Sequence, residues 1–246
     1  MDELGYWENE TEYDKHIISV FKIDSILSDY LKNYPNKNIC DVIDFGCGVG
    51  HAIPYLTGFK NIYAVDFSQN MLKQAQANYA ESSNIQFITG DLKSTILQPV
   101  ELILAVASVM PKDNDEFEQI INNFLANLKE NGQILMVLPS FESNTLLFHY
   151  KADYFKKEGW SNKKIQTKLR TMQEKQHYSP FGHLMTSIKL PQKHWLKEEI
   201  EFRLDKFSFN KIAIEKLQLD WVEQIPGHAV YKDYPKLWFW LVTIQR

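Results

Sequence analysis

The chain has little cysteine, no long apolar run and no excess of positive charge. Its two cysteines, Cys40 and Cys47, lie within one predicted strand and the turn after it, so that a disulfide is not expected and a reducing compartment is favoured. No stretch reaches the roughly 18 apolar residues that a membrane-spanning helix needs. The acidic start, Met1 to Leu4, lacks the apolar region of a signal peptide. These absences predict a cytoplasmic protein without a membrane partner.

Positive charge and metal ligands are also scarce. A net charge of −4 argues against a broad phosphate-binding face, so that no nucleic-acid partner is expected. The seven histidines show no spacing typical of a metal site, and no metal is therefore expected. The 246 residues are 44% hydrophobic, which is enough for one large α/β domain, with or without an inserted cap.

What the chain does have is a glycine-rich turn after an apolar strand. The stretch 42–50 reads Val-Ile-Asp-Phe-Gly-Cys-Gly-Val-Gly, so that Asp44 stands two residues before the first of three alternating glycines. A second apolar stretch, 62–65, ends on Asp66. Glycines at a strand–helix turn let the backbone approach a ligand closely, and a carboxylate that closes the second strand can accept hydrogen bonds from a ribose.

The glycine spacing distinguishes between two kinds of nucleotide cofactor. A dinucleotide-binding turn reads G-x-G-x-x-G and holds a pyrophosphate at a helix N-terminus. Here the glycines read G-x-G-x-G, and the carboxylate of Asp44 would repel a pyrophosphate but suit a ligand that brings a cation. The spacing therefore disfavours a hydride-transferring dehydrogenase.

The apolar pattern predicts strands that alternate with helices. Strands are expected at 40–45, 62–65, 85–89, 102–109 and 133–138, then at 212–219 and 237–244. Helices are expected at 13–32, 51–57 and 195–204, after Ser68 as an N-cap, and after Asp113 with Glu116 as a capping box. No strand is evident between 141 and 184. This order predicts a doubly wound, mostly parallel α/β sheet that binds its ligand beyond the carboxyl ends of the strands.

The D-x-G-x-G-x-G turn together with the acidic end of the second strand resembles the class I S-adenosylmethionine-dependent methyltransferases. The resemblance is strong over 40–140 and weaker over 195–246. It implies a seven-stranded Rossmann-like sheet with an antiparallel last strand, S-adenosyl-L-methionine as the cofactor and S-adenosyl-L-homocysteine as its product. It divides the chain into an N-terminal helical lid (1–38), a cofactor-binding core (39–140), a helical cap over the acceptor pocket (141–190) and the C-terminal part of the core (191–246).

The resemblance also assigns cofactor contacts. The glycine turn packs against the methionine portion, the second carboxylate binds the ribose, and the end of the third strand contacts the adenine. The residues assigned in this way are Asp44, Gly46, Cys47, Gly48, Gly50, Asp66, Phe67, Ser68, Met71, Gly90, Asp91, Leu92 and Ala105.

The acceptor side carries weaker signals. Acceptor contacts are assigned to Tyr6 and Tyr13, in an aromatic N-terminal segment that folds over the site, to Ser140, which is equally well a helix cap, and to His149. Nothing in the sequence identifies a general base, and His149 and His177 are the first to test. The aromatic residues of the cap favour an apolar or planar acceptor.

The leading interpretation is therefore a methyltransferase that acts on a small molecule. The acidic pI and the lack of an RNA-binding module argue against an RNA acceptor, whereas a protein acceptor stays open. A non-catalytic module that binds S-adenosylmethionine also stays open, because an intact motif does not demonstrate turnover. Neither the acceptor atom nor the oligomeric state has a signal in the sequence.

Overall fold

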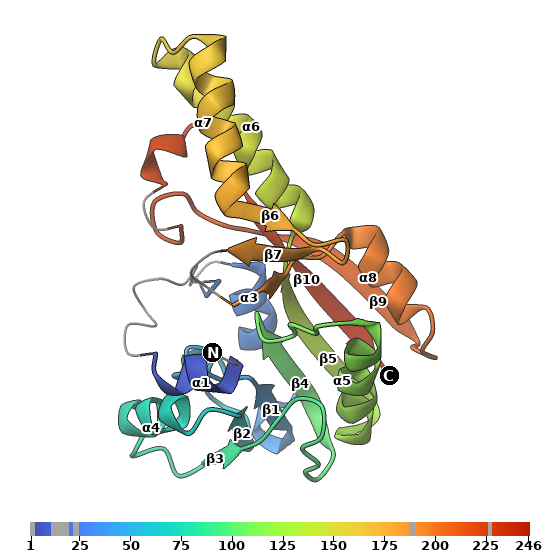
Figure 1. Ribbon diagram of the computed structural model, residues 1–246. Helices are drawn as coiled ribbons and strands as arrows, with labels where there is room; N and C mark the ends of the chain where they lie inside the picture. The colour runs from blue at the N-terminus through green and yellow to red at the C-terminus, as the bar shows by residue number, and fades with distance from the viewer. Residues whose placement is uncertain (1–2, 11–19, 22–24, 187–189, 226–227) are drawn as a thin grey trace.

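A computed structural model describes residues 3–10, 20–21, 25–186, 190–225 and 228–246 (Figure 1). Its centre is a sheet of seven strands. In spatial order these are β3 (Ile85–Thr89), β2 (Asn61–Asp66), β1 (Asp41–Phe45), β4 (Val100–Val106), β5 (Leu128–Pro139), β10 (Trp238–Gln245) and β9 (Lys211–Gln218). Within this sheet β10 runs antiparallel to both of its neighbours, and the pairs from β3 to β5 are parallel. The predicted doubly wound, seven-stranded sheet is confirmed.

Helices and loops cover both faces of this sheet. The helices are α1 (Glu3–Glu8), α3 (Ile26–Lys32), α4 (Gln69–Asn78), α5 (Asn114–Ala126), α6 (Phe141–Lys157), α7 (Asn162–Lys175) and α8 (Lys197–Leu204). Successive residues of a strand point to opposite faces. In β1, Phe45 therefore packs under α5, where its ring stacks on Phe124 at 5.2 Å, whereas Val42 packs in the cluster that contains Leu27 and Leu31 of α3. No helix in the described ranges combines the length and the apolar character needed to cross a bilayer.

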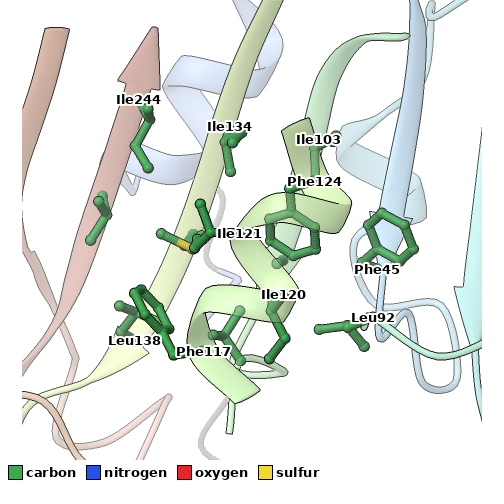
Figure 2. Close-up of a cluster of buried hydrophobic side chains, with 14 of the residues drawn as sticks. Phe45, Leu92, Ile103, Phe117, Ile120, Ile121, Phe124, Ile134, Leu138 and Ile244 are labelled. Carbon is green, nitrogen blue, oxygen red and sulfur yellow. The ribbon is translucent and has the colours of Figure 1, made fainter. Parts of the chain in front are cut away.

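The apolar face of α5 forms the centre of one core cluster (Figure 2). Phe117, Ile121 and Phe124 are almost completely buried against the sheet. The helix begins as predicted at Asp113, whose carboxylate accepts the Glu116 backbone N–H at 2.9 Å. The capping box is only half formed, because the Glu116 carboxylate accepts the N–H of Lys112 at 2.6 Å instead of that of Asp113.

Four elements differ from the predictions. The helix predicted at 13–32 begins only at Ile26 among the described residues: Val20 and Phe21 are not helical, and the Ser25 hydroxyl caps α3 by accepting the Ser28 N–H at 3.1 Å. Residues 13–19 and 22–24 lie outside the described residues. The stretch 51–57 holds only a 3-10 turn at Ile53–Tyr55, because a short segment with a proline that lacks an N–H cannot sustain an α-helix. β4 ends at Val106 rather than at 109, because Ala107 takes a left-handed conformation with φ of 53°. β5 begins at Leu128 instead of after Gly132, and its first residues pair irregularly with β4.

The insertion after β5 is not all helical. Helices α6 and α7 pack against each other as a hairpin that projects from the body (Figure 1). The chain then forms a separate antiparallel sheet of β6 (Gln176–Tyr178), β7 (His183–Thr186) and β8 (Gln192–Lys193). The expectation that no strand precedes Met185 is wrong, because these strands are too short to leave a periodic pattern. The boundaries assigned to lid, core and cap stay predictions.

Aromatic residues of α6 anchor the hairpin to the C-terminal part of the chain. The ring of Tyr150 packs on Tyr234 at 5.1 Å and lies 6.1 Å from that of Trp221, and the ring of Tyr154 packs on Tyr231 at 5.5 Å. These rings pack against one another. They therefore do not support the sequence-based argument for an apolar or planar acceptor.

Candidate functional site

The glycine turn after β1 is tied to the end of β2. The backbone N–H groups of Gly46 and Cys47 both donate to the carbonyl of Val65, at 2.8 and 3.0 Å. Gly46 has φ of 73°, and a Cβ added there would lie 2.3 Å from the Cβ of Ser108 in the loop after β4. Only glycine fits this close approach between the ends of β1 and β4.

Asp66 stands at the carboxyl end of β2 and holds this turn in place. Its two carboxylate oxygens accept the N–H groups of Gly48 and Ser68, each at 2.9 Å, and the side chain is buried. Burial raises the pKa of Asp66, and these two backbone hydrogen bonds offset part of that effect. Each oxygen keeps a lone pair, so that the carboxylate can still accept hydrogen bonds from two hydroxyl groups.

Asp44 is the second carboxylate of the turn, and it lacks a counter-charge. It is 2% exposed, and one of its oxygens, Oδ2, is buried without a hydrogen-bond donor. Burial, and then the charge of Asp66, raise the pKa of Asp44 to about 7. A buried carboxylate without a partner is costly. The turn therefore suits a ligand that brings positive charge.

The end of β3 lies beside Asp66, because the Gly90 N–H donates to the Asp66 carbonyl at 2.9 Å. The Asp91 carboxylate accepts the Lys93 N–H at 2.8 Å and remains partly exposed. Leu92 is buried in the core cluster under α5, and Ala105 lies in the same cluster, inside β4. Both can therefore contact a ligand only through the backbone.

Other residues that were assigned to the cofactor pack around the glycine turn. The Ser68 hydroxyl caps α4 by accepting the Met71 N–H at 3.2 Å, and both side chains are buried. Cys47 is buried beside Leu72, and burial raises the pKa of its thiol. Phe67 is only half-buried at the start of α4.

The N-terminal segment lies against the same edge. The Glu8 carboxylate accepts the N–H of Gln69 at 2.6 Å, and the side-chain amide of Asn70 donates to the Glu10 carbonyl at 3.0 Å. The charge of Glu8 also raises the pKa of Asp66. Helix α1, which carries the half-buried Tyr6, thus lies at the start of α4. Tyr13 lies outside the described residues.

Comparisons with known proteins agree with this geometry. Residues 42–132 match the family model described as a methyltransferase domain. The matched residues contain the glycine turn, Asp44 and Asp66, and the fold is that of the class I S-adenosylmethionine-dependent methyltransferases. The cofactor of this family is S-adenosylmethionine, as the sequence predicted, and the uncompensated carboxylate of Asp44 fits its positive charge.

The individual relatives are distant from this chain. Malonyl-[acyl-carrier protein] O-methyltransferase 2 of Coxiella burnetii is 27% identical over 101 residues, which is 40% of each chain. A methyltransferase structure from Methanosarcina mazei has a TM-score of 0.56 at 15% identity, covering 87% of this chain and 95% of that one. Magnesium protoporphyrin IX methyltransferase from Synechocystis PCC 6803 has a TM-score of 0.54 at 14% identity, covering 89% and 76%. Similarity at this level of identity supports the fold.

The small sheet β6–β8 lies against the loops that follow β4 and β5. The Nε2–H of His183 donates to the Pro111 carbonyl, after β4, at 2.7 Å. The backbone of Trp195 exchanges hydrogen bonds with the end of β5, donating to Pro139 at 2.8 Å and accepting from Phe141 at 3.0 Å. The sheet, rather than the helical hairpin, therefore covers the carboxyl ends of the strands on that side.

A polar group that the sequence analysis missed lies under this sheet. The side-chain amide of Asn144 donates to the Tyr178 hydroxyl at 2.6 Å, and that hydroxyl lies 2.8 Å from Nδ1 of His194. Burial, and then the charge of Lys193, lower the pKa of His194 to about 4, so that its ring is neutral near pH 7. Nδ1 then accepts a hydrogen bond from the Tyr178 hydroxyl. These three residues come from separate elements, and no spacing in the sequence connects them.

The acceptor residues that the sequence suggested are not gathered there. Ser140 is the N-cap of α6, accepting the Ser143 N–H at 3.0 Å, which is one of its two interpretations, and its assignment to the acceptor stays a prediction. His149 lies on α6 and His177 on β6, and both are exposed, so that neither is held in a buried position suited to a general base. Within the described ranges no three His, Cys, Asp or Glu side chains gather as metal ligands.

A second missed feature is the loop after β4. Ala107 has a left-handed backbone although it is not glycine, and it is exposed at the end of the strand. The Ser108 hydroxyl donates to the Phe45 carbonyl at 2.7 Å, which fastens this loop to the glycine turn. Backbone strain of this kind costs of order 1–3 kcal/mol and clusters at functional sites. Alternation of apolar residues does not reveal it.

Proposed function

We propose that the protein transfers the methyl group of S-adenosylmethionine to a small-molecule acceptor. The observation that carries the proposal is the buried, unpaired carboxylate of Asp44 beside the glycine turn. Among the described residues no donor meets its Oδ2 atom, and a cationic cofactor would relieve the cost of keeping it ionised. The other assigned cofactor contacts, from Gly46 to Ala105, are part of the same proposal.

The acceptor would bind between the loop after β4 and the sheet β6–β8. Three facts support this place: the left-handed Ala107, the contact of His183 with Pro111, and the polar group of Tyr178 and His194 under the sheet. Two relatives are named for their acceptors, as a malonyl-[acyl-carrier protein] O-methyltransferase and a magnesium protoporphyrin IX methyltransferase. Both names favour a small acceptor group, which the first relative receives on an acyl-carrier protein. The match covers only 40% of the length of the first, so that its acceptor is not transferred as such.

The chain's part in the reaction is positioning. The bound cofactor supplies an electrophilic methyl group. Asp66 would hold the ribose of the cofactor, Asp44 would face its positive end, and the loop of Ala107 and Ser108 would position the acceptor. Such positioning can contribute on the order of 7–11 kcal/mol of the barrier. Tyr178 would orient a polar group of the acceptor, and a base is needed only where the acceptor must lose a proton.

Two measurements test this proposal in order. Calorimetric titration with S-adenosylhomocysteine should show micromolar binding, whereas NAD should show none. Transfer of a labelled methyl group is then measured with a panel of small carboxylic acids, phenols and amines. Binding without transfer to any acceptor would leave the non-catalytic module as the better account, and binding of NAD alone would contradict the cofactor assignment.

A further inference from the structure

Positive charge is concentrated on the projecting hairpin of α6 and α7. Residues 141–175 hold eight Lys and Arg against four Asp and Glu, whereas the rest of the chain holds 19 against 27. The hairpin therefore has a net charge of +4 on a body of net charge −8. Figure 1 shows that it extends away from the sheet, so that this charge stands apart from the acidic body.

The positive charges on α7 form no ion pair with any residue that the structure describes. No acidic side chain of the described residues forms an ion pair with any of its five cations, which are Lys163, Lys164, Lys168, Arg170 and Lys175. Helix α8 differs, because Lys197 pairs with Glu201 and Arg203 lies 4.0 Å from Glu199. A helix that served only as a solvated surface would mix charges in the way that α8 does.

The cations also line a groove. An open groove of about 530 Å³ runs beside α7 and is lined by Trp160 and by Lys163, Lys164 and Lys168. The hydroxyls of Thr167 and Thr171, which also line it, are turned back to carbonyls of their own helix at 3.0 and 3.1 Å. The cationic donors of this groove are therefore lysine ammonium groups.

The apolar and aromatic surface of the hairpin is already covered. Ile165 is buried, and Leu169 is half-buried on the same side of α7. No large apolar side chain of the hairpin is strongly exposed, so that it lacks the apolar face with which a helix enters a bilayer surface. Trp160 stacks on Phe155 at 4.5 Å, and Lys164 lies over the Trp160 ring, 3.7 Å from its centre. These contacts leave Trp160 poorly placed to stack on a nucleic-acid base.

We infer that α7 is a docking surface for an acidic protein helix. The helix is 14 residues long, about 21 Å, and presents cations along its whole length. Carboxylates that recur once per turn on a partner helix would face these cations. A localised acidic partner also avoids the negative body, which a long polyphosphate would meet. The contact is electrostatic and small, so that it should be transient and weaken with salt.

Binding of matched anionic probes to the full-length protein tests this inference. The main probe is a labelled, alanine-rich helical peptide that carries seven glutamates, spaced one per turn. Its control peptide carries glutamine at the same positions. An eight-nucleotide oligouridine carries the same seven charges, and vesicles with 30% phosphatidylglycerol present an anionic membrane. Fluorescence anisotropy and co-sedimentation are measured from 20 to 150 mM salt.

The variant Lys163→Gln, Lys168→Gln, Lys175→Gln removes three charges and leaves Lys164 packed on Trp160. It should weaken binding of the acidic peptide about tenfold and flatten the salt dependence. A control variant removes three exposed lysines of the body, Lys60, Lys211 and Lys232, and should change the affinity less than twofold. The glutamine peptide should not bind.

Four results would overturn the inference. Tighter binding of oligouridine than of the peptide, dependent on the same lysines, would make α7 a nucleic-acid surface, and the same result with vesicles would make it a membrane surface. Equal effects of the two triple variants, or no peptide binding at 20 mM salt, would show that α7 is no docking surface.

Discussion

Replacing Asp44 with asparagine is expected to stabilise the ligand-free protein at pH 8 while it weakens cofactor binding. The pKa of Asp44 rises from 3.8 to about 7 on folding, chiefly through burial. A shift of about three units corresponds to about 4 kcal/mol of unfolding free energy lost when the folded protein carries this charge. The amide of asparagine leaves a buried donor unpaired, at about 1–3 kcal/mol, so that the net gain should be about 1–3 kcal/mol.

The sign of the pH dependence follows from the direction of this shift. Between about pH 4 and pH 7, the folded protein keeps a proton on Asp44 that the unfolded chain has released. The free energy of unfolding should therefore fall as the pH rises through this window, and should level off above pH 7. The raised pKa of Asp66 acts in the same direction and is common to both proteins. The slope specific to Asp44 should be absent from Asp44→Asn.

Urea unfolding at pH 5, 6, 7 and 8 measures the stability, and calorimetry with S-adenosylmethionine measures binding. The wild-type affinity should fall about tenfold per unit below pH 7, because the carboxylate must lose its proton to face a cation. The exposed Asp233 serves as a control for the removal of one charge. Equal pH slopes in wild type and Asp44→Asn, or an unchanged affinity in the variant, would refute the role assigned to Asp44.

Three further substitutions test neighbouring contacts. Gly46→Ala should lower stability and cofactor affinity, because its Cβ meets Ser108 at 2.3 Å; Gly159→Ala, which also has a positive φ but nothing within 4 Å, should show only the backbone cost of about 1–2 kcal/mol in urea unfolding. Tyr178→Phe should slow methyl transfer and leave the calorimetric affinity for S-adenosylhomocysteine unchanged; a loss of affinity would contradict its place on the acceptor side. Asp66→Ala should weaken that affinity about a hundredfold, and an unchanged value would refute the ribose assignment.

The cofactor half of the protein was predictable because its determinants are local in the sequence. Asp44 and the three glycines form one turn, and Asp66 ends the next strand. The residues of this site are therefore close along the chain. Ser68 and Asp113 begin their helices as predicted, because an N-cap depends on residues only two or three positions away. Apolar strands that are buried on both faces, such as β4, stand out as continuous runs. What failed here was detail: Pro54 prevented a helix, and Ala107 ended a strand early.

The acceptor half could not be predicted in the same way, because long-range contacts build it. Asn144, Tyr178 and His194 meet only after α6, α7 and a three-stranded sheet have formed between them. The histidines that the sequence suggested, His149 and His177, are exposed in the structure. The residues next to them in the sequence do not reveal whether they are buried. The two halves therefore differ in how they can change. With the acceptor placed as we propose, substitutions under the β6–β8 sheet would alter acceptor binding without touching the turn of Asp44, whereas a change in that turn would affect binding of the cofactor.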